Sequence, residues 1–153
     1  MDHRGIDTVL KDMRQHPEDA KVQEKGCKAL NRLAFNANNK VKIGAGGGVE
    51  AIVQAMGGHR GSEGVQRQGC GALLHLAVNA DIAGKIGAEG GVEAIVQAMG
   101  GHRRSKGVQE KGCWALWSLA LNADNAVKIG AGGGVEAIVQ AMGGHRGDRK
   151  SVV

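Results

Sequence analysis

The chain has 153 residues, of which 42% are hydrophobic and only 2% aromatic, so a core must be built from Ala, Val, Ile, Leu and Met. The 27 glycines do not recur at every third position and Pro17 is the single proline, which excludes collagen, while the Ile, Val and Leu content excludes a disordered linker. The net charge of +5, from 20 basic and 15 acidic residues, favours acidic partners without identifying them.

The three cysteines indicate neither a disulfide framework nor a structural zinc site. Cys27, Cys70 and Cys113 are odd in number and none belongs to a CxxC pair, so we expect small buried apolar residues. No stretch approaches the ~20 apolar residues that cross a bilayer, and the first residues lack the apolar core of a signal peptide. We expect no membrane partner, no metal and no cofactor, and a reducing compartment, the cytoplasm and/or the nucleus.

In chain order, the apolar spacing predicts helices of three lengths. Residues 5–16 form a helix of medium length, and residues 22–37 a longer amphipathic helix. Residues 38–45 carry too few apolar side chains for an independent helix, and we expect one or two turns that lean on their neighbours. Residues 49–56, VEAIVQAM, place apolar residues at i, i+3, i+4 and i+7, which predicts another medium helix.

These elements return with a period of 43 residues. The segment GVEAIVQAMGGHR, from Gly48 to Arg60, recurs from Gly91 and from Gly134. Other positions keep the same period, namely Cys27, Cys70 and Cys113, Leu30, Leu73 and Leu116, and Ile43, Ile86 and Ile129. We therefore predict one array over residues 1–153, with a partial unit of medium and long helices (5–36), two full repeats (37–79 and 80–122), the short and medium helices of a further unit (123–146) and a tail (147–153).

The glycines have positional roles in this array. Gly44 and Gly46 to Gly48 lie at the expected break between the short and medium helices, and Gly57 and Gly58 are expected to close the medium helix in a left-handed conformation. A glycine inside a helix costs about 1 kcal/mol relative to alanine, so those within the long helix predict close approaches between helices. They are Gly26, Gly69 and Gly112.

A unit of about 40 to 47 residues with a glycine turn between its first two helices resembles the armadillo repeat. The resemblance is most concrete from Gly112 to Met142, GCWALWSLALNADNAVKIGAGGGVEAIVQAM, which is similar to the family's third helix followed by the next repeat's first two, and it covers nearly the whole chain. It implies an all-α, right-handed superhelix of about three stacked three-helix repeats. It also implies that the third helices line a concave groove that binds extended peptides.

Motifs that suggest enzymatic or metal chemistry fit the repeat better. The cluster IGAGGG from Ile43 lacks the preceding strand and following acidic residue of a dinucleotide-binding loop. Histidines one repeat apart lie on helices about 8 to 10 Å apart, too far to share a zinc ion, so we expect surface turn positions. They are His16, His59, His102 and His145. The serines have no recurring His or acidic companion, so we expect no enzyme activity.

Comparison of the three units separates the core from the surface, because equivalent positions in a repeat array make equivalent contacts. The long helix varies mostly on one face, at Glu24, Lys28, Asn31, Arg32 and Phe35, then Arg67, Gly71, Leu74, His75 and Val78, then Glu110, Trp114, Trp117, Ser118 and Leu121. We predict that a partner binds there. The predicted binding residues are Glu24, Lys28, Arg32, Arg67, His75, Glu110, Trp114, Trp117 and Ser118.

The armadillo resemblance bears on the kind of peptide. In the nuclear-import members, a Trp and an Asn four residues later form the binding ladder. The corresponding pairs here are Lys28 and Arg32, Gly71 and His75, and Trp114 and Ser118, so the ladder is incomplete. Lys28 and Arg32 would repel a basic peptide, and we expect an acidic or mixed one.

Two sets of residues can each be interpreted in two ways. Trp114 and Trp117 are either exposed binding residues or a cover for the end of the core where repeats are missing. The amides at the end of each long helix either bind a peptide backbone or cap the next short helix. They are Asn36, Asn79 and Asn122.

Nucleic-acid binding is the alternative function. Two basic ridges recur along the array, Lys42, Lys85 and Lys128 and then Arg60, Arg103 and Arg146, and phosphates could use them. Acidic residues recur as well, at Glu50, Glu93 and Glu136, and no row of aromatic residues, on which nucleobases could stack, accompanies the basic residues. We therefore favour a protein partner.

The last unit predicts an uncovered surface. It nearly copies its neighbours and stops after its medium helix, so Met142 should lack the long helix that would cover it. We expect either that the chain is a fragment of a longer array or that it self-associates through such uncapped repeat ends.

Overall fold

The structure is a computed structural model that describes the backbone of residues 4–148 and the side chains of residues 5–143. Every regular element in the described backbone is an α-helix, which confirms the all-α prediction. The ten helices of this part are α1 (Arg4–Gln15), α2 (Ala20–Leu33), α3 (Ala37–Ala45), α4 (Gly48–Gly58), α5 (Glu63–Leu76), α6 (Ala80–Ala88), α7 (Gly91–Gly101), α8 (Lys106–Leu119), α9 (Ala123–Ala131) and α10 (Gly134–Asp148).

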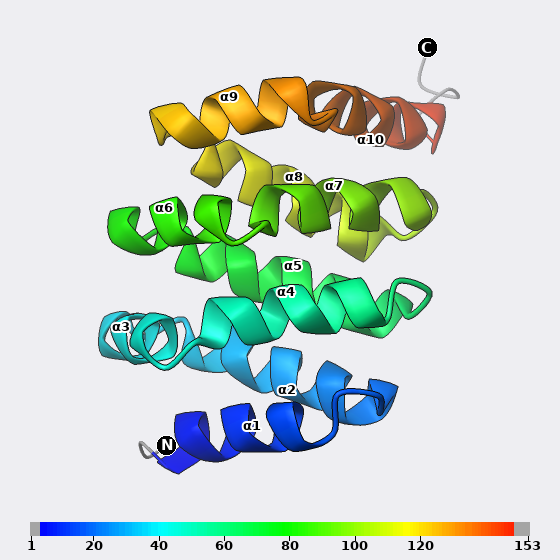
Figure 1. The fold of residues 1–153 in the computed structure, drawn as a ribbon. Helices are drawn as coiled ribbons and strands as arrows, with labels where there is room; N and C mark the ends of the chain where they lie inside the picture. The colour runs from blue at the N-terminus through cyan, green and yellow to red at the C-terminus, as the bar shows by residue number, and fades with distance from the viewer. Residues whose placement is uncertain (1–3, 149–153) are drawn as a thin grey trace.

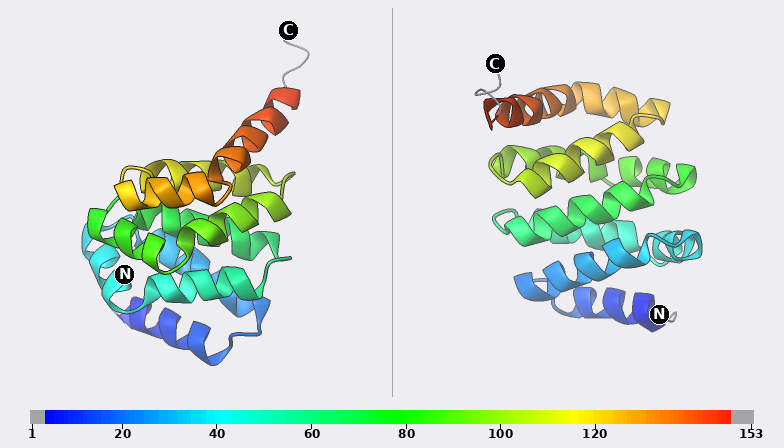
Figure 2. Two further views of the ribbon diagram at one scale, coloured as in Figure 1. Left: turned by 45° about the horizontal axis from the view of Figure 1, so that its top comes forward. Right: turned by 180° about the vertical axis from the view of Figure 1, so that it is seen from behind.

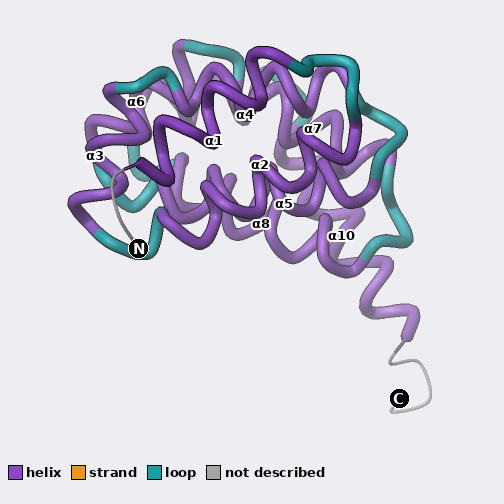
Figure 3. Tube along the Cα trace, turned by 90° about the horizontal axis from the view of Figure 1, so that it is seen from below, coloured by secondary structure: helices purple, strands orange, loops and turns teal. Residues whose placement is uncertain are grey.

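The helices follow one another along one axis in the order of the sequence (Figure 1). The long helices α2, α5 and α8 lie side by side, and α4 and α7 each pack against the long helix that follows them. Seen from behind, the long helices form the near side of the stack (Figure 2), and along the axis they lie opposite α1, α4 and α7 (Figure 3). α2, α5 and α8 therefore share one continuous face.

Recurring apolar positions form the core, as predicted. Side chains that are 0% exposed include those of Cys27, Cys70, Leu30, Leu73, Leu116, Ile43 and Ile86. Cys113 is the exception among the cysteines, because it is only half-buried at the last long helix. Burial of an apolar side chain contributes about 1.5–3 kcal/mol, so this repeated core is the main source of stability.

Side-chain caps fix where the helices begin. The side-chain oxygens of Asn36, Asn79 and Asn122 accept backbone hydrogen bonds at 3.1, 3.0 and 3.0 Å from the third residue of each short helix. Asp19, Ser62 and Ser105 cap the long helices in the same way. The oxygens of the asparagines are thus occupied, which favours helix capping over peptide binding.

The turn from a short to a medium helix depends on one glycine. Its φ is 83° at Gly47, 87° at Gly90 and 88° at Gly133, a left-handed conformation that other residues rarely adopt. Gly44 does not lie at this turn, as was predicted. It is buried inside α3, because the short helix extends over nine residues and not one or two turns. Packing of buried Ile43 against the core explains how so short a helix persists.

The predicted left-handed closure at Gly57 and Gly58 is wrong, because neither residue has a positive φ. A buried glutamine of the next long helix holds this end instead. Gln66 Nε2 donates hydrogen bonds to the carbonyl oxygens of Met56 and His59, at 3.0 and 2.8 Å. Gln23 and Gln109 make the equivalent bonds in their units. Each glutamine therefore joins a medium helix to the long helix that follows it.

The last helix departs from its equivalents. α4 and α7 end at Gly58 and Gly101, whereas α10 continues to Asp148, beyond the predicted unit boundary at residue 146, and projects from the body (Figure 2). In the described part of the chain no long helix follows α10, so no glutamine reaches its last carbonyls and no turn is imposed there.

The predicted uncovered surface lies on α10 and is confirmed. Met142 is 58% exposed, whereas Met56 and Met99, at the same position in earlier units, are 2% exposed. Val135 is 54% exposed, against 1% for Val92. The same residues thus form core in α7 and surface in α10.

Candidate protein-binding site

The exposed surface of α2, α5 and α8, which we call the long-helix face, contains most of the predicted binding residues. Lys28, Arg32, Glu110, Trp114 and Trp117 are exposed on it. Glu24, Arg67 and His75 are half-buried. Ser118 is a correction, because its side chain is only 9% exposed. The short serine side chain ends below the surface that longer side chains reach at this position, so Ser118 offers little to a partner.

A pair of tryptophans dominates the α8 part of this face. Trp114 and Trp117 are 59% and 62% exposed, and their rings meet edge to face with centroids 5.8 Å apart. Leu121, one turn further on, is 80% exposed. Partly desolvated aromatic pairs of this kind are the residues on which binding energy concentrates.

A row of apolar side chains lies at the edge of the long-helix face, two residues beyond the last residue of each of the three helices. It consists of Phe35, Val78 and Leu121, which are 68%, 72% and 80% exposed. Val78 is the informative member, because its unit has neighbours on both sides and the residue is still mostly exposed. The exposure of this row is therefore a property of the repeat and not of the ends of the array.

His75 lies at the junction between α2 and α5. Its Nδ1 is 2.7 Å from Asn31 Oδ1, and its ring is 4.2 Å from that of Phe35. Desolvation lowers the pKa of His75, and the nearby charges of Lys40 and Lys111 lower it further. The imidazole is thus held in its neutral form within a basic environment.

Two of the predicted residues already have partners within the chain. Arg67 Nη1 lies 2.6 Å from Glu63 Oε1, and Ser105 Oγ donates a 2.6 Å hydrogen bond to Glu63 Oε2. The Ser105 hydrogen bond and the Arg67 charge lower the pKa of Glu63. Glu24 packs on the first turn of α5, where a Cβ on Gly64 would come within 2.6 Å of its Oε2. The Arg67–Glu63 pair lies within α5, but Arg67 Cδ would be 2.7 Å from a Cβ on Gly107 of α8, so Arg67 and Glu24 each pack against a neighbouring long helix.

Comparison with known proteins adds no family to this description. No family model, no curated protein and no solved structure is significantly similar to the chain. The function must therefore be argued from the geometry of its surfaces.

The lysine ridge is engaged within the chain. Lys85 Nζ donates a hydrogen bond of 2.9 Å to Gly44 O, and Lys128 Nζ donates one of 2.8 Å to Gly87 O, so each binds the last turn of the preceding short helix. Arg60 and Arg103 are exposed, whereas the side chain of Arg146 lies outside the described residues. Lys85 and Lys128, two of the six proposed phosphate-binding residues, thus have structural partners.

The recurring histidines also join units, a role that the sequence interpretation missed. His59 Nε2 is 2.8 Å from Pro17 O, and His102 Nε2 is 2.6 Å from Arg60 O. Both are half-buried and not simple surface residues, while His16 is exposed and the side chain of His145 lies outside the described residues. Among residues 5–143, no group of three or more His, Cys, Asp or Glu is placed to hold a metal ion. No helix within residues 4–148 is long and apolar enough to cross a bilayer.

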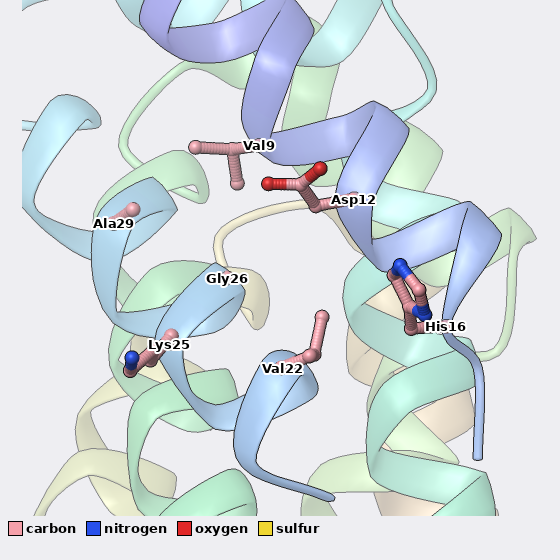
Figure 4. A pocket seen from close by; sticks show the side chains of 7 residues that line it. All are labelled: Val9, Asp12, His16, Val22, Lys25, Gly26 and Ala29. Atoms are coloured by element: carbon pink, nitrogen blue, oxygen red, sulfur yellow. The ribbon is translucent and has the colours of Figure 1, made fainter. Parts of the chain in front are cut away.

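A hollow of about 490 Å³ opens between α1 and α2 (Figure 4). Its lining includes Val9, Asp12, Val22 and Lys25. The equivalent positions in the next unit lie under the preceding long helix, where Val65, for example, is 0% exposed. The hollow therefore corresponds to a helix-stacking position of the repeat, and its shape does not indicate a small-molecule site.

Proposed function

We propose that the chain is a right-handed solenoid of armadillo-like repeats that binds a peptide segment of a protein partner along the long-helix face, without catalysis. The exposed apolar surface of this face, and above all Val78 at 72% exposure inside the array, carries the proposal. Isolated exposed apolar residues are ordinary, but an apolar row repeated across three helices beside two tryptophans marks an interaction surface. The 43-residue period supports the repeat assignment.

The proposal is tested with a library of random twelve-residue peptides displayed against the folded chain. Dissociation constants of recovered peptides are then measured for the wild type, Trp114→Ala and Arg103→Ala. Because Trp114 is exposed, its removal should leave the helical content unchanged, and we expect it to weaken binding by about 2 kcal/mol or more. Arg103→Ala is the control and should change little.

The same variants test the nucleic-acid alternative. The proposal would be overturned if a single-stranded oligonucleotide bound the chain with a steep salt dependence, if Arg103→Ala abolished this binding and if Trp114→Ala left it unchanged. The hydrogen bonds of Lys85 and Lys128 to backbone carbonyls argue against that result.

We also propose that the uncovered face of α10 promotes self-association. This proposal rests on the exposure of Val139, at 61%, together with that of Val135 and Met142. Light scattering over a concentration series should show mass growing with concentration, and Val139→Gln should reduce the growth. A mass that stays monomeric throughout would contradict this part of the proposal.

A further inference from the structure

Charged groups are unevenly distributed on the long-helix face. Lys111 of α8 reaches this junction, where its Cε would lie 3.2 Å from a Cβ on Gly71, one turn before His75 on α5. Desolvation lowers the pKa of His75, and the charges of Lys40 of α3 and Lys111 lower it further. Lys28 and Arg32 are exposed on α2, within one turn of Asn31, the hydrogen-bond partner of His75. We call Lys28, Arg32, Lys40 and Lys111 the basic cluster.

Fewer acidic than basic side chains lie at this junction. Glu24 packs at the start of α5, one turn before Lys28 and about 12 Å from Arg32 along the axis of α2 at roughly 1.5 Å per residue. Glu63 is bound to Arg67 and Ser105. Glu110 precedes Trp114 by one turn, on α8. Even with Glu24 and Glu110 counted, the four members of the basic cluster keep an excess of positive charge at the junction of α2 and α5.

The large apolar side chains are concentrated at α8. Trp114 and Trp117 on α8, with Leu121 two residues beyond its end, are 59% to 80% exposed. On α5 the position equivalent to Trp114 is Gly71, which is buried beneath Asn31 and Lys111. The basic cluster therefore lies over α2 and α5, whereas the largest apolar cluster, with both tryptophans, lies at α8, and the row of Phe35, Val78 and Leu121 runs past all three helices.

We infer that this face binds an extended segment with an acidic residue and a large apolar residue three to five positions apart. The acidic side chain lies at the basic cluster, and the apolar side chain lies on Trp114 and Trp117. Neighbouring packed helices are about 8 to 10 Å apart, and an extended chain advances about 3.3 Å per residue, so crossing from the α2/α5 junction to α8 takes about three to five residues. The inference rests on the proposed function and specifies the peptide.

The peptides recovered from the random twelve-residue library test it. We expect peptides whose binding depends on Trp114 to be enriched in Asp or Glu three to five positions from Trp, Phe, Leu or Met. Arg32→Glu should weaken them at least tenfold, and replacing the acidic residue by its amide should have a similar effect. Lys11→Glu, an equal charge change on exposed α1, should alter affinity by less than twofold.

A second measurement locates the acidic residue of the bound peptide on the long-helix face. When a recovered peptide binds, a carboxylate beside the basic cluster should raise the pKa of His75, measured by NMR, and its amide version should not. Peptides that depend on Trp114 but lack the acidic residue, or that respond alike to Arg32→Glu and Lys11→Glu, would overturn the inference and leave the proposed function standing. Recovery of no peptide that depends on Trp114 would overturn both.

Discussion

Gly69 of α5 lies directly against Met56 of α4, so that a Cβ on Gly69 would stand 2.6 Å from Met56 Cγ. The same relationship joins Gly112 to Met99 and Gly26 to Met13 in the other units. The glycines predicted to mark close approaches thus do so, and each accommodates the methionine of the medium helix beside it.

This contact predicts opposite effects for two glycine-to-alanine changes. Gly69→Ala should destabilise the chain by about 1–2 kcal/mol, because overpacking exceeds the gain in helix propensity. Gly57→Ala is the control, since nothing lies within 4 Å of its Cβ, and it should stabilise by up to about 1 kcal/mol. Urea unfolding followed by circular dichroism measures both. Equal stabilisation by the two changes would contradict the close approach.

The buried glutamines should be costly to remove. Gln66→Ala removes the hydrogen bond to the buried carbonyl oxygen of Met56, while His59 O keeps the hydrogen bond from Ser62 N, and we expect a loss of about 1–3 kcal/mol in the free energy of unfolding. Gln97→Ala, at an exposed position of α7, should change it by less than about 0.5 kcal/mol. A small effect of Gln66→Ala would mean that this helix end does not need the bond.

Glu89 predicts a pH dependence of stability. Its Oε2 is buried without a hydrogen-bond partner, and desolvation followed by the charge of Glu50 raises its pKa. The folded state thus binds a proton more tightly than the unfolded state, so stability falls as the pH rises through the pKa of the unfolded state and on through that of the folded state. Glu89→Gln should raise the melting temperature at pH 7 and lose this advantage toward pH 4. An advantage that persists at pH 4 would exclude titration of Glu89 as the cause.

The thiols should react in two classes. Burial raises the pKa of Cys27 and of Cys70 to about 12, and both side chains are 0% exposed. Cys113 is half-buried with a smaller rise in its pKa from desolvation, because no further long helix covers α8 in the described chain. A disulfide reagent should therefore modify Cys113 first in the native protein, and Cys113→Ser should remove the fast phase. Three equal rates would contradict this difference in burial.

Much of the fold was predictable because the repeat itself carries the information. Identical letters 43 residues apart make equivalent contacts where the same neighbouring helices are present, so Leu30, Leu73 and Leu116 were recognisable as core without a structure. The same reasoning located the uncovered Met142, since burial there depends on a helix that the described chain does not supply.

The polar links within and between units were not predicted from the sequence, because a spacing does not show which carbonyl a side chain will reach. Gln66, Lys85 and His59 recur at the repeat period, and a recurring polar residue beside core positions was the available signal. Ser118 was misplaced for a related reason. Its position faces outward in the repeat, but the length of the side chain decides whether it reaches solvent.

The sequences of α4, α7 and the first eleven residues of α10 are identical, which has a kinetic consequence. During folding each long helix meets three interchangeable partners, and the contacts made are equally favourable with any of them. Only the four-residue connections, such as residues 59–62 between α4 and α5, select the correct one by keeping it close. At high concentration that advantage shrinks, and helices from neighbouring chains can exchange places, so refolding yield should fall with concentration. The short connections therefore determine which helices pair, whereas the core stabilises the pairs without distinguishing the correct partner.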